Sequence, residues 1–359
     1  MPRRPTIVLA GGGHAHLYSL RRTGELAARG FDVALVNPSP HLYYSGMATG
    51  VISGLYEPSE TRVDVQKLVK EGGGRFVEGR VERVLDGELL LEGGDTIAFD
   101  AASFNLGSAA PRVSGSGEDI PVKPVENAAR IRDLTLELAA RKRNPRVLVA
   151  GGGAAGCEVA ANLLAPPGDV RLTLAEAGEE LLPDSPARAG KMMREFLLEH
   201  GAEVLLGSPV EEIAAGRARA GEREIPYDLL VSALGLTPTG VFRRSEGLMT
   251  GEDGGLWVNR HLQSVSDARL FGGGDAVAYR GGRLPRLGVF AVRQSPVIFH
   301  NLQAVLRGEP LRSYEPQRRY LYILNLGDGA GLAVYGSLVY RGRLALLLKQ
   351  RLDSRFVRK

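Results

Sequence analysis

The sequence is poor in the features that several large classes of protein require. Its 359 residues include one cysteine, Cys157, so an intramolecular disulfide and a Cys-x-x-Cys site are both excluded. No run of residues approaches the ~18 consecutive apolar residues of a membrane-spanning helix. The basic N-terminus leads into a short apolar stretch and then a glycine turn, which is typical of a first strand and not of a signal peptide. We therefore expect a cytoplasmic globular protein.

Charge is also not concentrated. The formal net charge is +4, and both signs are mixed along the chain except for basic clusters at its two ends. Solvated faces explain this pattern, so we expect no nucleic-acid partner. No spacing of His, Cys, Asp and Glu is typical of a metal site, so no metal is expected. At roughly 150 residues per domain, the length favours two or three domains.

The clearest motif is a glycine turn between an apolar strand and an Ala/Leu-rich helix, at residues 146–164. Gly151 allows the turn, Gly153 lets a pyrophosphate approach the backbone, and Gly156 allows the helix to pack on the strand. The next strand ends in Glu176, twenty residues beyond Gly156, where a carboxylate can bind a ribose 2′-OH. The alternative is a turn that binds nothing, but the strand, helix and acid together favour a dinucleotide site.

A second copy of this motif opens the chain. Residues 6–10 form an apolar run that ends at Gly11, Gly12 and Gly13, and a later strand ends at Asn37. Here the third glycine is replaced by His16, so helix and strand must pack differently. The expected acid is Asn37, which can hydrogen-bond a ribose but has no charge. His14 and His16 are candidates to contact phosphates, or only to cap the helix and fill space.

Further segments extend the repeat. The strands predicted near residues 99–108 and 227–235 end at Gly107 and Gly235, and a third glycine segment contains Gly274 and Asp275. Asp275 is placed to bind a sugar or ribitol hydroxyl. The long period predicts two nucleotide-binding domains in one chain. We expect a discontinuous first domain, a second domain and a C-terminal segment, with bounds 1–112 plus 248–310, 113–247, and 311–359.

Other segments carry weaker signals. Residues 41–57 are aromatic and glycine-rich without a clear period, and we expect them to pack over a ligand or a domain seam, with Tyr44 beside a ligand or in the core. Residues 75–99 and 203–225 predict antiparallel hairpins. Pro296 interrupts a helical pattern at 288–306, so a kink or a restart is expected. The tail, 346–359, predicts at best a short basic amphipathic helix, which either lies on an anionic membrane surface or docks on its own domain.

These segments, in this order, resemble the flavoproteins with two dinucleotide-binding domains, the pyridine nucleotide-disulfide oxidoreductase superfamily. Within it the chain is similar to type II NADH dehydrogenases and sulfide:quinone reductases. The stretches GGGHAHL, YYSGMATGVISGLY and GVFAVRQSPVIFHNL are still more similar to the NADH dehydrogenase-like proteins sometimes fused to selenide, water dikinase. The resemblance implies an α/β fold with two Rossmann-like domains, each with a β-meander, and a small C-terminal α+β segment ending in a helix.

The resemblance also implies two cofactors, FAD in the first domain and NADH in the second. The residues implied for FAD are Gly11, Gly13, His14, Ala15, Asn37, Gly107, Gly274 and Asp275. Those implied for NADH are Gly151, Gly153, Gly156, Glu158, Glu176 and Gly235, with Glu158 near the nicotinamide. Tyr44, Arg293 and Gln294 are the catalytic candidates. Arg293 and Gln294, near a helix start, would stabilise negative charge at the pyrimidine end of the flavin.

Three departures from the family pattern limit the chemistry. With Cys157 alone, neither a redox disulfide nor sulfur transfer through cysteines is available, and a small buried packing residue is the expected role of Cys157. Val289 stands where type II dehydrogenases carry the first glutamine of their Ala-Gln-x-Ala-x-Gln pattern. Their longer C-terminal membrane-binding helices are missing or reduced.

The sequence therefore predicts an FAD-dependent oxidoreductase that accepts a hydride from NADH and passes electrons to a small acceptor, a quinone or another molecule. The alternative is a flavin-binding redox sensor or partner subunit with little NADH turnover. Two further partners are possible. The tail could make a weak peripheral contact with the cytoplasmic face of the membrane, and the chain could form a homodimer.

Overall fold

The structure, a computed structural model, describes residues 3–165 and 169–358 and divides into two units. The first unit comprises Met1–Leu42, Val63–Ala109 and Leu236–Arg318. The second comprises Tyr43–Arg62, Ala110–Gly235 and Arg319–Lys359. The chain leaves the first unit in β3 (His41–Tyr43) and returns to it in β4 (Arg62–Asp64).

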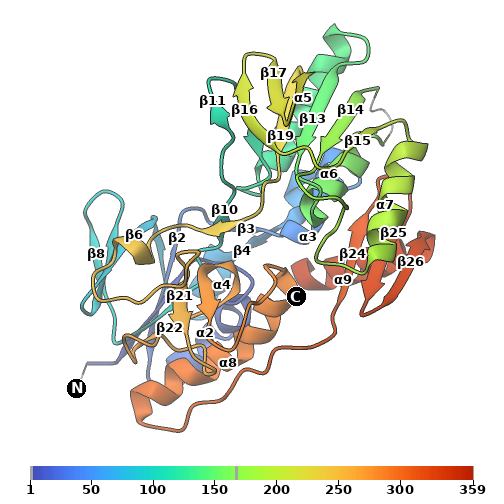
Figure 1. Ribbon diagram of the computed structural model, residues 1–359. Coiled ribbons are helices and arrows are strands. Elements are labelled where there is room, and N and C mark those ends of the chain that lie inside the picture. Colours follow the sequence, from blue (N-terminus) through green and yellow to red (C-terminus); the bar gives the residue numbers. More distant parts are fainter. Residues whose placement is uncertain (1–2, 166–168, 359) are drawn as a thin grey trace. The chain divides into compact units, whose positions relative to one another are not determined.

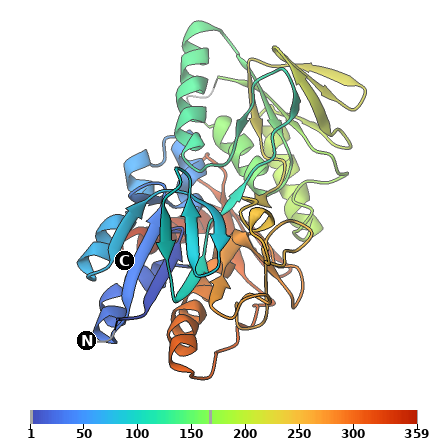
Figure 2. The same ribbon diagram turned by 90° about the vertical axis from the view of Figure 1, so that its left-hand side faces the viewer.

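The first unit is built on a parallel sheet of five strands (Figures 1 and 2). Their order is β22 (Leu270–Gly272), β9 (Ala101–Phe104), β1 (Thr6–Ala10), β2 (Asp32–Asn37) and β5 (Arg75–Glu78). The central strand β1 is apolar, and Ile7, Val8 and Leu9 are fully buried. A strand that is buried on both faces is typical of a parallel sheet between helices.

The other elements of the first unit surround this sheet. Its helices are α1 (Leu17–Leu20), α2 (Thr23–Ala28), α4 (Val65–Glu71) and α8 (Gly288–Arg307), and its short 3-10 helices are η2 (Phe242–Arg244) and η3 (Gly274–Ala276). An antiparallel meander is formed by β6 (Val81–Leu85), β7 (Glu88–Leu91) and β8 (Thr96–Ala98). Two small strand pairs complete it, β10 (Ser108–Ala109) with β20 (Thr237–Pro238) and β21 (Leu256–Val258) with β23 (Val277–Tyr279).

The second unit has a parallel sheet of the same design (Figure 1). Its order is β12 (Ile120–Pro121), β19 (Leu229–Ser232), β13 (Arg146–Ala150), β14 (Arg171–Ala175) and β15 (Glu203–Leu205). In both sheets the chain passes from the central strand outward through two strands on one side and then returns to the strand on the other side of the centre; in the second sheet the edge strand β12 comes before the central strand in the sequence. The two Rossmann-like sheets predicted from the internal repeat are therefore confirmed.

The remaining elements of the second unit are helices and two smaller sheets, which are antiparallel except for the parallel pair β11 and β16. The helices are η1 (Pro58–Thr61), α3 (Ser45–Ile52), α5 (Asn127–Arg141), α6 (Ala154–Leu163), α7 (Ala187–Glu199) and α9 (Arg343–Arg358). A four-stranded sheet contains β11 (Ser114–Gly115), β16 (Val210–Ala214), β17 (Arg217–Ala220) and β18 (Arg223–Pro226), and a three-stranded sheet contains β24 (Leu321–Asn325), β25 (Gly331–Tyr335) and β26 (Leu338–Gly342).

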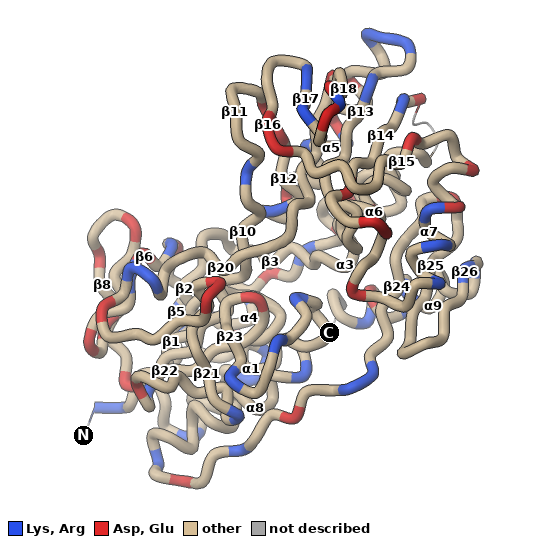
Figure 3. The backbone as a smooth tube through the Cα atoms, in the orientation of Figure 1, with Lys and Arg blue, Asp and Glu red and all other residues tan. Residues whose placement is uncertain are grey.

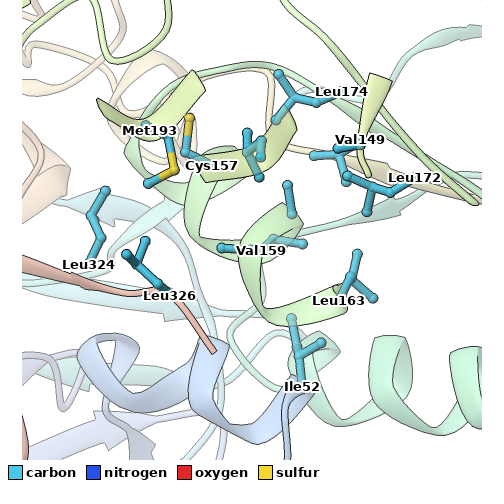
Figure 4. Close-up of a cluster of buried hydrophobic side chains, with 14 of the residues drawn as sticks. Ile52, Val149, Cys157, Val159, Leu163, Leu172, Leu174, Met193, Leu324 and Leu326 are labelled. Atoms are coloured by element: carbon cyan, nitrogen blue, oxygen red, sulfur yellow. The ribbon is translucent and has the colours of Figure 1, made fainter. Parts of the chain in front are cut away.

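One large apolar core holds the second unit together (Figure 4). It joins α6 and the parallel sheet to α3 through Val51 and Ile52, and to the C-terminal sheet through Leu324 and Leu326. This packing explains why Tyr43–Arg62 and Arg319–Lys359 belong to the second unit. The predicted bounds had placed Tyr43–Arg62 in the first domain and Arg319–Lys359 in a separate C-terminal segment.

Several local predictions need correction. Residues 45–52 form helix α3, although their sequence shows no helical period, because Met47, Val51 and Ile52 are buried by packing that a single-sequence pattern does not contain. The predicted hairpins are present, but β5 and β15 belong to the parallel sheets. Helix α8 does not restart at Pro296. Pro296 has no N–H to donate to the Val292 carbonyl, and both residues lie on the exposed side of the helix.

Candidate functional site

The glycine turn of the second unit has the backbone that the motif requires. Gly151 has a φ of 108°, and a Cβ there would lie 2.5 Å from the carbonyl oxygen of Ala233 on the neighbouring chain segment. A Cβ at Gly156 would collide with the carbonyl oxygen of Gly151. At Gly153, in contrast, nothing lies within 4 Å of a Cβ. Two of the glycines are thus needed for close packing, and the third leaves open space beside the backbone.

Helix α6 begins at this open position. Gly153 is its N-cap residue, and among the described residues no side chain caps the first turn. The unpaired N–H groups and the positive end of the helix dipole favour an anion there. The turn therefore fits the pyrophosphate of a dinucleotide.

Glu176 closes the other side of the turn. Its carboxylate accepts hydrogen bonds from the backbone amides of Gly152 and of Gly178, the latter at 2.7 Å. Each carboxylate oxygen has a second lone pair, so the group can still accept a hydrogen bond from a ribose hydroxyl. The side chain is partly buried at the carboxyl end of β14, where ligands of parallel sheets bind.

The first unit repeats this geometry with an amide. Gly11 has a φ of 89°, and a Cβ there would collide with the carbonyl oxygen of Asn105. The Oδ1 atom of Asn37 accepts a hydrogen bond from the amide of Gly12 at 2.8 Å, as Glu176 does from Gly152. The Nδ2 atom of Asn37 donates to the carbonyl of Ser39 at 2.6 Å. Asn37 thus has the structural role of Glu176, without its charge.

The first turn differs from the second at its helix. Where the second motif has Gly156, the fully buried ring of His16 contacts the Gly11 carbonyl oxygen through Nδ1 at 2.6 Å and Ser103 Oγ through Nε2 at 2.8 Å. Burial lowers the pKa of His16 to about 4, so the ring is neutral at pH 7. His16 is therefore a packing residue and not a phosphate contact, and the prediction that helix and strand pack differently here is confirmed.

Asn105 is a residue of the first turn that the sequence reasoning missed. Its Oδ1 accepts a hydrogen bond from the Ala15 amide at 3.0 Å, and its Nδ2 donates to the Gly273 carbonyl at 2.9 Å. It thereby joins the first glycine turn to the third glycine segment. The internal repeat could have pointed to it. Asn105 stands two residues before Gly107, as Ala233 stands two residues before Gly235, so a polar residue replaces an alanine at the matching position. His14 lies against the start of α8, where a Cβ at Gly288 would be 3.4 Å from its ring.

The third glycine segment forms η3. The Gly274 amide donates to Gln294 Oε1 at 2.7 Å, and Ser108 Oγ donates to the Asp275 carboxylate at 2.7 Å. Gln294 is 1% exposed, so it supports this loop from inside, whereas Arg293 is exposed. Of the two catalytic candidates on α8, only Arg293 therefore presents its side chain to solvent. Gly107 and Gly235 both have positive φ and open space on the Cβ side.

Tyr44 and Glu158 lie in the second unit with partners that were not predicted. The Tyr44 ring stacks on Phe356 of α9, with 4.3 Å between ring centroids. The Oε1 atom of Glu158 accepts a hydrogen bond from the Asn325 amide at 2.6 Å. Burial raises the pKa of both groups, and the nearby Lys349 charge opposes this shift for Glu158. In the sequence, Lys349 gives no signal beyond its place in a basic tail.

Cys157 lies within the apolar core of the second unit (Figure 4). It is 0% exposed, and its Sγ donates to the Gly152 carbonyl oxygen at 3.1 Å. Burial raises the pKa of the thiol, so it is protonated at neutral pH and is not a nucleophile.

The tail forms helix α9, which has two different faces. Ala345 and Leu346 are buried, whereas Leu344, Leu347, Leu348 and Leu352 are 69%, 59%, 43% and 45% exposed. Positive and negative residues are interspersed along both units (Figure 3), and Arg343, Arg351 and Arg355 are exposed on α9. Among the described residues, none of the helices is long and apolar enough to cross a membrane.

Comparison with known proteins agrees with this fold and these turns. Residues 5–295 match the model of the family "Pyridine nucleotide-disulphide oxidoreductase". The demethylphylloquinone reductase NdbB of Synechocystis is 27% identical, over 97% of this chain and 91% of its own. The type II NADH:quinone oxidoreductase of Haemophilus influenzae is 27% identical over 47% of this chain and 42% of its own. The structure of NDH2 from Plasmodium falciparum in complex with NADH superposes with a TM-score of 0.83 at 14% identity, covering 99% and 96% of the two chains.

The two turns and the two parallel sheets have the geometry of two dinucleotide-binding domains. The chain belongs to the pyridine nucleotide-disulphide oxidoreductase family, whose members bind FAD and NAD(P)H. It is an NAD(P)H-dependent flavin oxidoreductase of NADH dehydrogenase-like type, and with one cysteine it has no redox disulfide.

Proposed function

We propose that this enzyme takes a hydride from NADH in the second unit and passes electrons, through FAD in the first unit, to a small acceptor of the quinone class. The observation that carries the proposal is the repeated turn, in which a backbone amide is bound by Asn37 in one unit and by Glu176 in the other. The names of two similar proteins, a demethylphylloquinone reductase and an NADH:quinone oxidoreductase, support a quinone as acceptor.

Different residues would hold NADH and FAD. NADH would be held by the open backbone at Gly153, the N-terminus of α6 and Glu176. FAD would be held by the turn at Gly11 to Gly13, by Asn37 and Asp275, and would supply the hydride-accepting chemistry. The same loop would include His14, Ala15, Gly107 and Gly274. In the second unit Gly235 would have this role, and Glu158 would contribute from helix α6. Arg293, exposed on α8, would provide a positive charge.

The first prediction concerns the choice of nicotinamide cofactor. The Glu176 carboxylate should bind a free ribose 2′-OH and repel a 2′-phosphate. Such a charge-assisted hydrogen bond contributes roughly 1.5–3 kcal/mol, or about ten- to a hundredfold in affinity. Glu176→Ala should weaken NADH binding by this factor in a fluorescence titration. Glu176→Gln, which retains an acceptor, should lose less.

Glu180→Ala is the matched control, because Glu180 is an exposed carboxylate four residues further on. It should leave NADH affinity unchanged. Equal affinity of the unmutated protein for NADH and NADPH would contradict the role of Glu176.

The second prediction concerns the exit of electrons. Val289, the second residue of α8, offers a quinone carbonyl no hydrogen bond, which a glutamine would offer at about 0.5–1.5 kcal/mol. We expect rapid reduction of the flavin by NADH, slower reoxidation by short-chain quinones, and faster reoxidation by artificial dyes. Val289→Gln should speed reoxidation by quinone, measured by stopped-flow absorbance.

Val292→Gln, at an exposed position of the same helix, is the control and should change neither rate. Reoxidation of the unmutated protein by quinone as fast as flavin reduction would contradict the role of Val289. A flavin that NADH does not bleach would favour the alternative, a redox sensor or partner subunit.

The third prediction concerns a membrane surface. The exposed leucines of α9, with Arg343, Arg351 and Arg355, would bind weakly to anionic lipid, at about 1 kcal/mol per basic residue. The full chain should float with vesicles containing anionic phospholipid at low salt and be released by high salt. The double substitution Leu347→Ser and Leu348→Ser should abolish flotation.

Leu198→Ser is the matched control, since Leu198 is 45% exposed on α7. It should leave flotation intact. Equal flotation of the α9 double variant and the unmutated chain would exclude this surface.

A further inference from the structure

The second unit contains a cavity that the proposed reaction does not use. Its volume is about 610 Å³, within the roughly 300–1,000 Å³ of small-molecule sites. It lies between α5, the turn at 215–216 that joins β16 to β17, and the two segments 116–120 and 227–230, which lead into β12 and β19. Among the described residues that line it, none belongs to the glycine turn at 151–156 and none is Glu176. The cavity is therefore separate from the dinucleotide loop of the same unit.

Helix α5 gives the cavity a largely apolar wall. Its lining residues recur at helical spacing, and they are Arg130, Leu134, Glu137, Leu138 and Arg141. A different side of the helix, with Ala128 and Ile131, is buried in the core. Leu134 and Leu138 are partly buried in the middle of the stripe. The apolar surface is continued by three buried residues, Ile120, Leu229 and Leu230. The apolar part of a ligand can be removed from water against this wall.

The lining also contains a buried carboxylate. The Asp119 side chain is 3% exposed, and its Oδ2 accepts a hydrogen bond from Ser232 Oγ. Its Oδ1 lies 3.8 Å from Nη1 of Arg112, beyond hydrogen-bond distance, and the Arg112 side chain is 75% exposed. Among residues 3–165 and 169–358, no donor forms a hydrogen bond to Oδ1. Because a buried charge is costly unless it is paired, a cationic donor at Oδ1 would be favourable.

Most other charges of the cavity are already neutralised. Glu137 is paired with Arg141 at 2.5 Å on the helix, and Asp228 is paired with Lys142 at 2.8 Å. Arg130 is exposed on α5, so solvent screens its charge. None of these groups therefore supplies the missing donor to Asp119.

A second acid acts on the same part of the cavity. Glu118 is exposed, and among the described residues it has no ion pair. The Tyr227 hydroxyl donates to the carbonyl oxygen of Ala214 at 3.1 Å, so its own oxygen is left as an acceptor. Burial, then the charges of Asp119 and Glu118, raise the pKa of Tyr227. Both carboxylates thus act at the Tyr227 hydroxyl, and the three oxygens belong to one acidic part of the lining.

We propose that this cavity binds a small organic ammonium ion with an apolar body. An ammonium group has three donors and no acceptor. It would donate to Asp119 Oδ1 and to the Tyr227 oxygen, with Glu118 as a second negative charge. The apolar body would lie against Leu134 and Leu138. This site goes beyond the hydride reaction, and its occupation requires neither FAD nor NADH.

Three probes of one shape and different charge test the site. They are phenethylammonium, phenethyl alcohol and hydrocinnamate, each titrated into the purified full chain at low salt and followed by calorimetry. A charge-assisted hydrogen bond should make phenethylammonium bind about ten- to a hundredfold more tightly than the alcohol. Hydrocinnamate should show no saturable binding. Equal affinity for the ammonium ion and the alcohol, or no saturable binding of the ammonium ion, would overturn the proposal.

Variants locate the binding. Asp119→Asn keeps an acceptor for Ser232 Oγ but removes the charge, so it should weaken phenethylammonium about tenfold or more and change the alcohol less than about twofold. Glu118→Gln, at an exposed site where folding is not at risk, should weaken the ammonium ion about two- to fivefold.

Asp133→Asn is the matched control, because Asp133 is an exposed carboxylate of α5 outside the lining. It should leave all three affinities unchanged. The melting temperature of each variant shows whether it is folded. If Glu118→Gln and a folded Asp119→Asn both bind phenethylammonium as tightly as the unmutated chain, the ammonium ion binds elsewhere and the proposal is wrong. Since no titration contains NADH or an electron acceptor, the result does not depend on the proposed function.

Discussion

The structure depends on the close approach of a glycine turn to the carbonyl of a neighbouring strand. At Gly11 that carbonyl belongs to Asn105, and at Gly151 it belongs to Ala233. Neither turn has room for a Cβ, and each requires a positive φ, which glycine adopts without strain. Once the turn is made, the amide of the following glycine points at the end of the next strand. Asn37 and Glu176 accept a hydrogen bond from it there, so the loop at the carboxyl edge of each parallel sheet is held in a fixed conformation.

The two loops have diverged in ways that suit different ligands. In the second unit Gly153 is open, α6 starts directly after it, and the closing side chain is charged. In the first unit Asn105 takes the Ala15 amide and His16 fills the space of the third glycine. Fewer backbone amides are then available beside the helix. In the proposed FAD site, binding would therefore rest more on Asn37 and on Asp275, which lies in η3.

Much of this could be predicted from the sequence, because both turns are local. A strand, three glycines and a helix follow one another within twenty residues, and the distance to Asn37 or Glu176 is set by one helix and one strand. Helix α3, the Asn105 contacts and the Lys349–Asp353 pair could not be predicted in the same way. Each depends on partners between about 100 and 300 residues away in the sequence. A lysine four residues before an aspartate gives the same sequence pattern whether the helix face is buried or exposed to solvent.

In the proposed reaction flavin is the sole two-electron group, since Cys157 is buried, protonated and without a second cysteine. An anaerobic titration of the purified flavoprotein with NADH, followed by flavin absorbance, counts the electrons that the protein takes up. One NADH per flavin should complete the bleaching. A requirement for two NADH per flavin would reveal another two-electron group and would contradict this chemistry.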